Sequence, residues 1–197
     1  MAEHLRTYLE RLPNGLGSYP DCRSKGILIR STADAVPFHE SWNELPAVIA
    51  NAFRSPPLPT AWVSTVLTNA VHCVIADTYY PIPAALLTWN YERTRRLSAT
   101  PMYRMFAQLA GLKNFLRGAV KVHSFFIQGT DLGITFSAGG ATITLEHPPY
   151  LHGGVVHLAN EAVFRATLES AGATRVFVKM TESSPDRAVF EASWAEA

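Results

Sequence analysis

The sequence predicts an α+β fold, with a helical N-terminal half packed on a four-stranded antiparallel sheet built as ββαββ. Through most of residues 1–127, apolar side chains recur with the period of about 3.6 residues typical of amphipathic helices. After Gly129 the period falls to about two, as in half-buried strands. Hydrophobic residues make up 48% of the 197 residues and charged residues 17%, a balance typical of a packed globule. We therefore expect one domain over residues 1–197, with its helical part at about 1–127 and its ββαββ part at about 130–197.

Proline and glycine divide the N-terminal half into helices. Pro13-Asn14-Gly15 ends the first one, and the proline-rich run at 55–59 marks a break in the middle. The helix that follows this break keeps a wide apolar face, so we expect it to be central. The predicted helices cover about residues 2–12, 20–32, 44–54, 60–78, 83–97, a segment starting at Pro101, and 112–126.

The C-terminal third alternates between apolar and polar residues. Two such runs, at 133–138 and 141–146, are joined by Gly139-Gly140, which indicates a tight hairpin. A helix at 156–171 follows and ends before Gly172. Two further strands, at about 175–181 and 187–194, complete the predicted sheet. One face of this sheet is apolar, and we expect helices to cover it.

The charge of the sequence argues against a nucleic-acid partner and leaves an acidic protein partner as one alternative. The net charge is +1, which gives no overall field for nucleic acid. The middle of the chain is basic and the tail from Phe125 is acidic. Solvated helix faces explain this asymmetry, and the alternative is a surface for an acidic protein partner. The residues predicted for that surface are Arg93, Arg96, Lys113, Arg117 and Lys121.

Two cysteines, Cys22 and Cys73, lie far apart without the spacing of metal ligands. The N-terminus lacks the apolar core of a signal peptide, and no stretch approaches the ~20 apolar residues of a membrane span. We therefore expect free thiols, no membrane span and a reducing, cytoplasmic location.

Three pieces of the sequence carry a resemblance. They are Gly15-Leu16-Gly17-Ser18-Tyr19-Pro20, the run from Arg95 to Gly118, and the hairpin–helix–hairpin tail ending in Trp194. Together they resemble a family of uncharacterised domains of about this length, largely confined to myxobacteria. The tail of that family is similar to the fold shared by haem nitric oxide/oxygen-binding (H-NOX) domains, 4-vinyl-reductase-like domains and TRAPP Bet3-type subunits. The resemblance implies helices against an antiparallel sheet and, as in several members, an apolar ligand between the two layers.

His123 is the residue with the most specific hypothesis. It lies on the apolar stripe of the 112–126 helix, and the segment from Phe115 to His123 resembles the one that supplies the proximal haem histidine of H-NOX domains. The Tyr-x-Ser-x-Arg signature of that family has no counterpart in the stretch 145–150, which contains neither serine nor arginine. Haem is therefore disfavoured, and a hydrogen-bonded core histidine is the favoured alternative.

Other histidines give weaker signals. His147, His152 and His157 recur every five residues, which places them on one face of neither a helix nor a strand. A loop could gather them around zinc, but an ordinary surface loop is the favoured interpretation. His72-Cys73 lie on a predicted helix, where adjacent side chains point about 100° apart and cannot form a catalytic dyad. We read this pair as a buried thiol beside a partly exposed imidazole.

The sequence contains no recognisable catalytic or nucleotide-binding motif, so we expect no enzymatic activity and no metal site. Our first hypothesis is a ligand-binding or sensory module for an apolar small molecule. The alternatives are a dimeric interaction module that uses the basic surface, and a haem-based gas sensor through His123. The ligand-binding residues predicted by the first hypothesis, which a filled core explains equally well, are Leu116, Val120, His123, Ile134, Phe136, Ile143 and Leu145.

Overall fold

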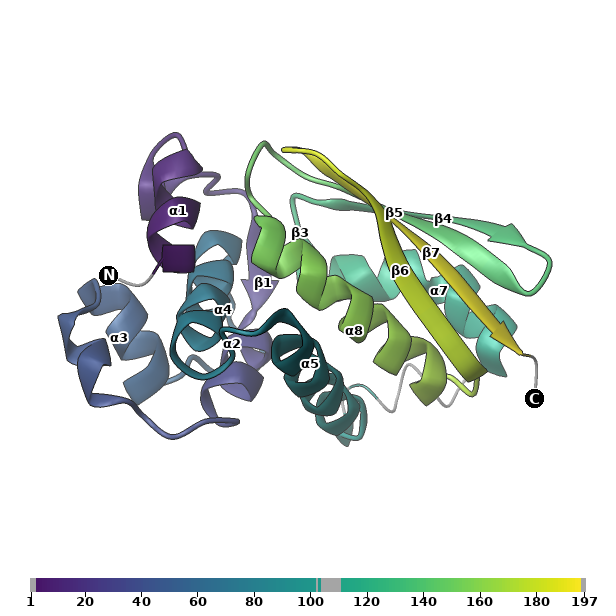
Figure 1. The fold of residues 1–197 in the computed structure, drawn as a ribbon, viewed down its shortest axis with the longest axis horizontal. Helices are drawn as coiled ribbons and strands as arrows, with labels where there is room; N and C mark the ends of the chain where they lie inside the picture. Colours follow the sequence, from purple (N-terminus) through teal and green to yellow (C-terminus); the bar gives the residue numbers. More distant parts are fainter. Residues whose placement is uncertain (1–2, 102, 104–110, 196–197) are drawn as a thin grey trace.

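The computed structural model describes residues 3–101, 103 and 111–195, without the side chains of 111–117. The predicted α+β class is confirmed, with a helical N-terminal half and a four-stranded antiparallel sheet (Figure 1). The helices of the first half are α1 (Glu3–Arg11), α2 (Gly26–Ala33), α3 (Ala47–Arg54), α4 (Thr65–Tyr79), α5 (Pro83–Ser98) and α7 (Gly111–Phe126), with short 3-10 turns at Gly15–Gly17 and Glu40–Glu44. The predicted helix starting at Pro101 has its apolar positions outside the described residues.

Helix α4 forms the centre of the helical half, as its wide apolar face predicts. Val66, Ala70 and Val71 are fully buried in the hydrophobic cluster of this half. Asp77, near the end of α4, accepts hydrogen bonds from the backbone N–H groups of His4 and Leu5, at 2.9 and 3.0 Å. A carboxylate at a helix N-terminus satisfies amides that have no partner within the helix. Asp77 therefore fixes α1 against α4.

Two predicted helices begin too early. Residues 23–25 form strand β1 (Arg23–Lys25) before α2, and β2 (Trp62–Ser64) precedes α4. Strand β1 pairs antiparallel with β2 and with β3 (Ile127–Gln128), which gives a small sheet of order β2-β1-β3. Strands of two or three residues are too short to show an alternating pattern, so no periodic signal predicts this sheet.

The larger sheet consists of β4 (Asp131–Ser137), β5 (Gly140–Glu146), β6 (Thr174–Ser183) and β7 (Arg187–Ala195), in the order β4-β5-β7-β6. All its neighbours are antiparallel. Helix α8 (Gly154–Ser170) connects β5 to β6 and packs on the sheet, while α7 packs on β4 (Figure 1). Gly139 has a φ of +71°, which supports the predicted hairpin between β4 and β5. The predicted ββαββ unit is thus present with small shifts at its ends.

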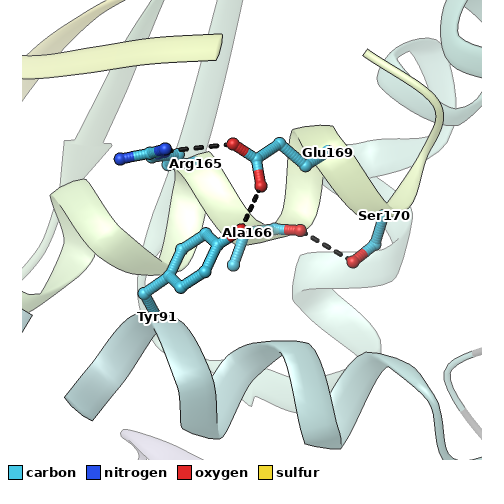
Figure 2. A network of polar contacts seen from close by, with 5 residues as sticks. All are labelled: Tyr91, Arg165, Ala166, Glu169 and Ser170. Carbon is cyan, nitrogen blue, oxygen red and sulfur yellow. Dashed lines mark hydrogen bonds and ion pairs between the residues drawn. The ribbon is translucent and has the colours of Figure 1, made fainter. Parts of the chain in front are cut away.

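Helices α5 and α8 lie side by side, and a polar network joins them (Figure 2). The Tyr91 hydroxyl on α5 donates to the Glu169 carboxylate on α8, and Arg165 Nε donates to the other oxygen of Glu169 at 3.0 Å. The Arg165 guanidinium also lies 5.1 Å from the centre of the Tyr91 ring. These contacts fix α5 against α8. Among the described helices, none combines the length and the apolar character that a bilayer crossing requires.

Candidate functional site

A cavity of about 170 Å³ lies under the four-stranded sheet, between α7 and α8. Most of its wall is hydrophobic, and the inner faces of β4 and β5 close it on one side. Helix α2 contributes Leu28 from the helical half. The described residues that line it are Leu28, Tyr103, Ala119, Val122, His123, Phe126, Ile127, Leu132, Ile134, Ile143, Val163, Phe164, Thr167 and Leu168. This position between helices and sheet is the one that the sequence predicts for a ligand.

His123 places a polar group in this hydrophobic wall. Its Nε2 lies 2.9 Å from the Thr130 hydroxyl, on the short segment that leads into β4. Desolvation by burial lowers the pKa of His123 to about 4, against a smaller opposite effect of Asp131. The imidazole is therefore neutral at pH 7, so it can exchange hydrogen bonds with an uncharged ligand without the cost of a buried charge.

The structure brings some of the predicted ligand-binding residues together and leaves others apart. His123, Ile134 and Ile143 line the cavity. Leu145 is buried but is not among the lining residues, and the side chain of Leu116 lies outside the described part of the chain. Val120 and Phe136 require a correction.

Val120 is 45% exposed because it lies on the outer side of α7, and Phe136 is 50% exposed beside the turn of the β4–β5 hairpin. Neither of these two residues lines the cavity. Sequence reasoning missed the α8 side of the wall, formed by Val163, Phe164, Thr167 and Leu168. Their spacing of three and four residues along one helix was a usable signal.

The basic surface predicted for an acidic partner loses one of its residues, because Arg93 is buried. Arg93 is 9% exposed, and its Nη1 donates to the hydroxyls of Ser31 and Thr32 at 3.0 and 3.2 Å. It therefore joins α5 to α2 and does not belong to a surface. Arg96 and Lys121 are exposed. The side chains of Lys113 and Arg117 lie outside the described residues.

The three histidines at 147, 152 and 157 form a compact buried cluster, so the interpretation as an ordinary surface loop is wrong. His147, His152 and His157 are 7%, 6% and 1% exposed. Their ring centres lie 4.7 to 6.3 Å apart, and the Nε2 atoms of His147 and His157 are 2.8 Å apart. Tyr150, with a φ of +63°, reverses the chain between them. Desolvation lowers the pKa of all three, to about 4 for His157.

This cluster is not arranged as a metal centre. Among the described residues, no three histidine, cysteine, aspartate or glutamate side chains form a group that could hold a metal ion. The Asn69 amide nitrogen lies 3.2 Å from His152 Nδ1 and 2.7 Å from the Leu151 carbonyl oxygen. Because Nδ1 accepts from Asn69, the proton of neutral His152 is on Nε2, and that nitrogen has no lone pair for a metal.

The His72-Cys73 pair is also buried, which corrects the expectation of a partly exposed imidazole. His72 Nε2 lies 3.3 Å from the Asn90 amide nitrogen, and burial lowers the pKa of His72 to about 3. Burial raises the pKa of the Cys73 thiol to about 12. The imidazole is paired with Asn90 and not with the thiol, so the protonated thiol has no base to activate it.

Comparison with solved structures gives the same architecture. The chain superposes on the Fe(II) unliganded H-NOX protein from K. algicida with a TM-score of 0.53 and 12% identity, covering 88% of this chain and 97% of that one. A mutant of the T. tengcongensis H-NOX gives a TM-score of 0.54, 11% identity and coverage of 87% and 95%. The fold is H-NOX-like. Neither a family model nor a curated protein matches the sequence.

Haem is associated with the H-NOX family, and binding it would set two requirements on the described residues. A haem needs a free imidazole nitrogen for its iron and a pocket well above the ~300 Å³ at the lower end of ordinary ligand sites. The cavity here measures about 170 Å³, and His123 Nε2 is hydrogen-bonded to Thr130. The described residues therefore do not fit a haem, although the H-NOX-like fold itself is shared.

Proposed function

We propose that this chain is a ligand-binding or sensory module whose ligand is a small apolar molecule held against His123. The observation that carries the proposal is a mainly hydrophobic cavity of about 170 Å³ with a neutral, hydrogen-bonded imidazole in its wall. A cavity of about 150 Å³ in a protein core is enough to bind benzene. The size therefore favours a ligand of one aromatic ring or a short aliphatic chain.

The chemistry of the wall narrows the ligand class further. His123 and Thr130 share one hydrogen bond, which a ligand hydroxyl can replace or extend. A buried anion or cation is unfavourable beside an imidazole whose pKa is lowered to about 4 by desolvation. An uncharged phenol is therefore a better probe than benzoate or an amine.

The test uses phenol and a pair of variants on α7. Ala119 lines the cavity, and its neighbour Val120 is exposed on the outside of the same helix. Phenol at millimolar concentration is expected to raise the melting temperature and to shift the amide NMR signals of Thr130 and Leu132. Ala119→Leu fills the cavity and abolishes both effects, whereas Val120→Leu retains them.

Two results would contradict the proposal. One is a wild-type protein whose melting temperature and NMR signals do not respond to phenol, benzene or xenon, which would mean that the space is an imperfectly packed core. The other is an equal response in the Ala119→Leu variant, which would place the binding elsewhere. Native mass spectrometry of the protein from its own host then identifies the natural ligand as an added mass that is lost on denaturation.

A further inference from the structure

Ser183 stands at the end of a continuous chain of hydrogen bonds through two buried histidines. It is the last residue of β6, and its hydroxyl lies 2.9 Å from His157 Nδ1 on α8. His157 Nε2 lies 2.8 Å from His147 Nε2, and His147 Nδ1 lies 2.9 Å from the Pro148 carbonyl oxygen. All three distances are within the ~2.6–3.2 Å expected between a nucleophile, its base and the group that orients the base.

The direction of every hydrogen bond in this chain follows from its far end. The Pro148 carbonyl can only accept, so His147 carries its proton on Nδ1. His147 Nε2 is then an acceptor, and His157 donates to it from Nε2. His157 Nδ1 is left with a lone pair, which accepts the hydroxyl proton of Ser183. The neutral tautomer of His157 is thus the one that a general base for Ser183 requires.

The serine of this chain lies at the surface, and the two histidines are buried. Ser183 is exposed, whereas His157 is 1% and His147 is 7% exposed. A reagent can therefore reach the hydroxyl while the base stays shielded from water. The backbone N–H of His147 donates to the Asp186 carbonyl at 2.9 Å, which ties this loop to the β6–β7 turn and holds the three groups together. The low pKa of His157, about 4, keeps it unprotonated at neutral pH.

We propose that Ser183 is a nucleophilic serine, activated by His157 as general base and positioned through His147, that reacts with small uncharged acyl or phosphonyl electrophiles. With a fluorophosphonate, Ser183 Oγ forms a bond to phosphorus and fluoride leaves. The hydroxyl proton passes to His157 Nδ1, and the resulting imidazolium continues to donate from Nε2 to neutral His147. This site uses none of the cavity residues and goes beyond ligand binding. No local sequence motif predicts this site, because His147, His157 and Ser183 are far apart in the sequence.

The test is labelling with diisopropyl fluorophosphate, followed by intact mass and peptide mapping. We expect one adduct, on Ser183. The neighbouring Ser184 is the matched control, since its hydroxyl donates to Asp186 at 2.8 Å and contacts no histidine. Ser183→Ala abolishes labelling and Ser184→Ala leaves it unchanged. His157→Gln slows it about 100-fold or more, the contribution typical of a general base.

His147 is tested by rescue and by the pH profile. His147→Gln keeps an oxygen that can accept from His157 and retains most of the labelling rate. His147→Leu removes the acceptor and lowers the rate, because the imidazolium of His157 loses the partner to which it donates. Equal slow labelling of Ser183 and Ser184, or a wild-type rate that does not fall between pH 6 and pH 4, would overturn the proposal. Melting temperatures confirm that each variant is folded.

Discussion

His147 and His157 face each other through their Nε2 atoms at 2.8 Å, and both side chains are buried. Two imidazoles at this distance form one hydrogen bond only if at least one of them is neutral. The contact joins the end of β5 to α8, so the protonation state of this pair bears directly on how the sheet and its connecting helix stay together.

We predict that the protein loses stability as the pH falls from about 6.5 towards 4. Burial lowers the folded-state pKa of His72 to about 3 and those of His123 and His157 to about 4. Above the ordinary histidine pKa of about 6.5, both states are neutral and the stability is at its full value. Below it, the unfolded chain binds protons that the folded chain does not, so the free energy of unfolding decreases until the folded-state pKa is reached.

Each pKa unit of difference corresponds to about 1.4 kcal/mol, so the combined loss is several kcal/mol. Urea denaturation at pH 7.5, 6.5, 5.5 and 4.5 measures it. His72→Gln is expected to make the slope against pH shallower, because one of the three buried imidazoles is then absent. A stability that is constant from pH 7.5 to 4.5 would show that these imidazoles are hydrated.

The bond between His123 and Thr130 gives a second prediction. Thr130→Val keeps the shape of the side chain but leaves His123 Nε2 without its partner, at a cost of about 1–3 kcal/mol in the free energy of unfolding. Thr135→Val, at an exposed position of β4, is expected to change it by less than about 0.5 kcal/mol. A double variant that also carries His123→Phe should recover part of the loss, because both polar groups are then removed together.

The size of the cavity predicts how the protein responds to haemin. Added haemin is expected to give only the spectrum of free haemin and no sharpened Soret band, since the cavity of about 170 Å³ is too small for the macrocycle. Absorbance titration of wild type and His123→Ala measures this. A new Soret band that the variant lacks would mean that the helices move apart to admit a haem.

The fourth prediction separates two arginines on α5. Arg93→Met removes the donors to Ser31 and Thr32 and is expected to cost about 1–3 kcal/mol of stability. Arg96→Met, on the exposed side of the same helix, is expected to cost less than about 0.5 kcal/mol. Thermal unfolding measures both. An equal loss of stability in the two variants would mean that Arg93 is a surface residue, as the sequence predicts.

The larger elements could be predicted because their patterns are long. The hairpin at Gly139-Gly140 and the helix after it are encoded by local alternation and turn residues that do not depend on distant contacts. The small sheet could not be predicted, because β1 is a strand only through its bonds to residues near 63 and 127. The helices predicted from the sequence therefore began too early and included residues that form strands only through tertiary pairing.

The site was predicted in part for the same reason. His123, Ile134 and Ile143 lie on regular elements, so their inward direction follows from the period. The histidine cluster lies around the turn at Tyr150, whose positive φ places His147 and His152 close together against any regular spacing. No periodic pattern in the sequence predicts such a turn. The contact of His157 with Ser183 depends on the tertiary packing that places the end of β6 beside α8.

The three-stranded sheet β2-β1-β3 has a consequence for the order of folding. Arg23 pairs with Ser64 on one side and with Gln128 on the other, so its closure joins segments from opposite ends of the helical half. Closing such long loops costs conformational entropy before any of these hydrogen bonds form. The few hydrogen bonds of such short strands offset only a small part of that cost. The sheet is therefore expected to form last, after the hydrophobic clusters around α4 and under β7 have each collapsed, as a late step that locks the N-terminal segment onto the end of α7.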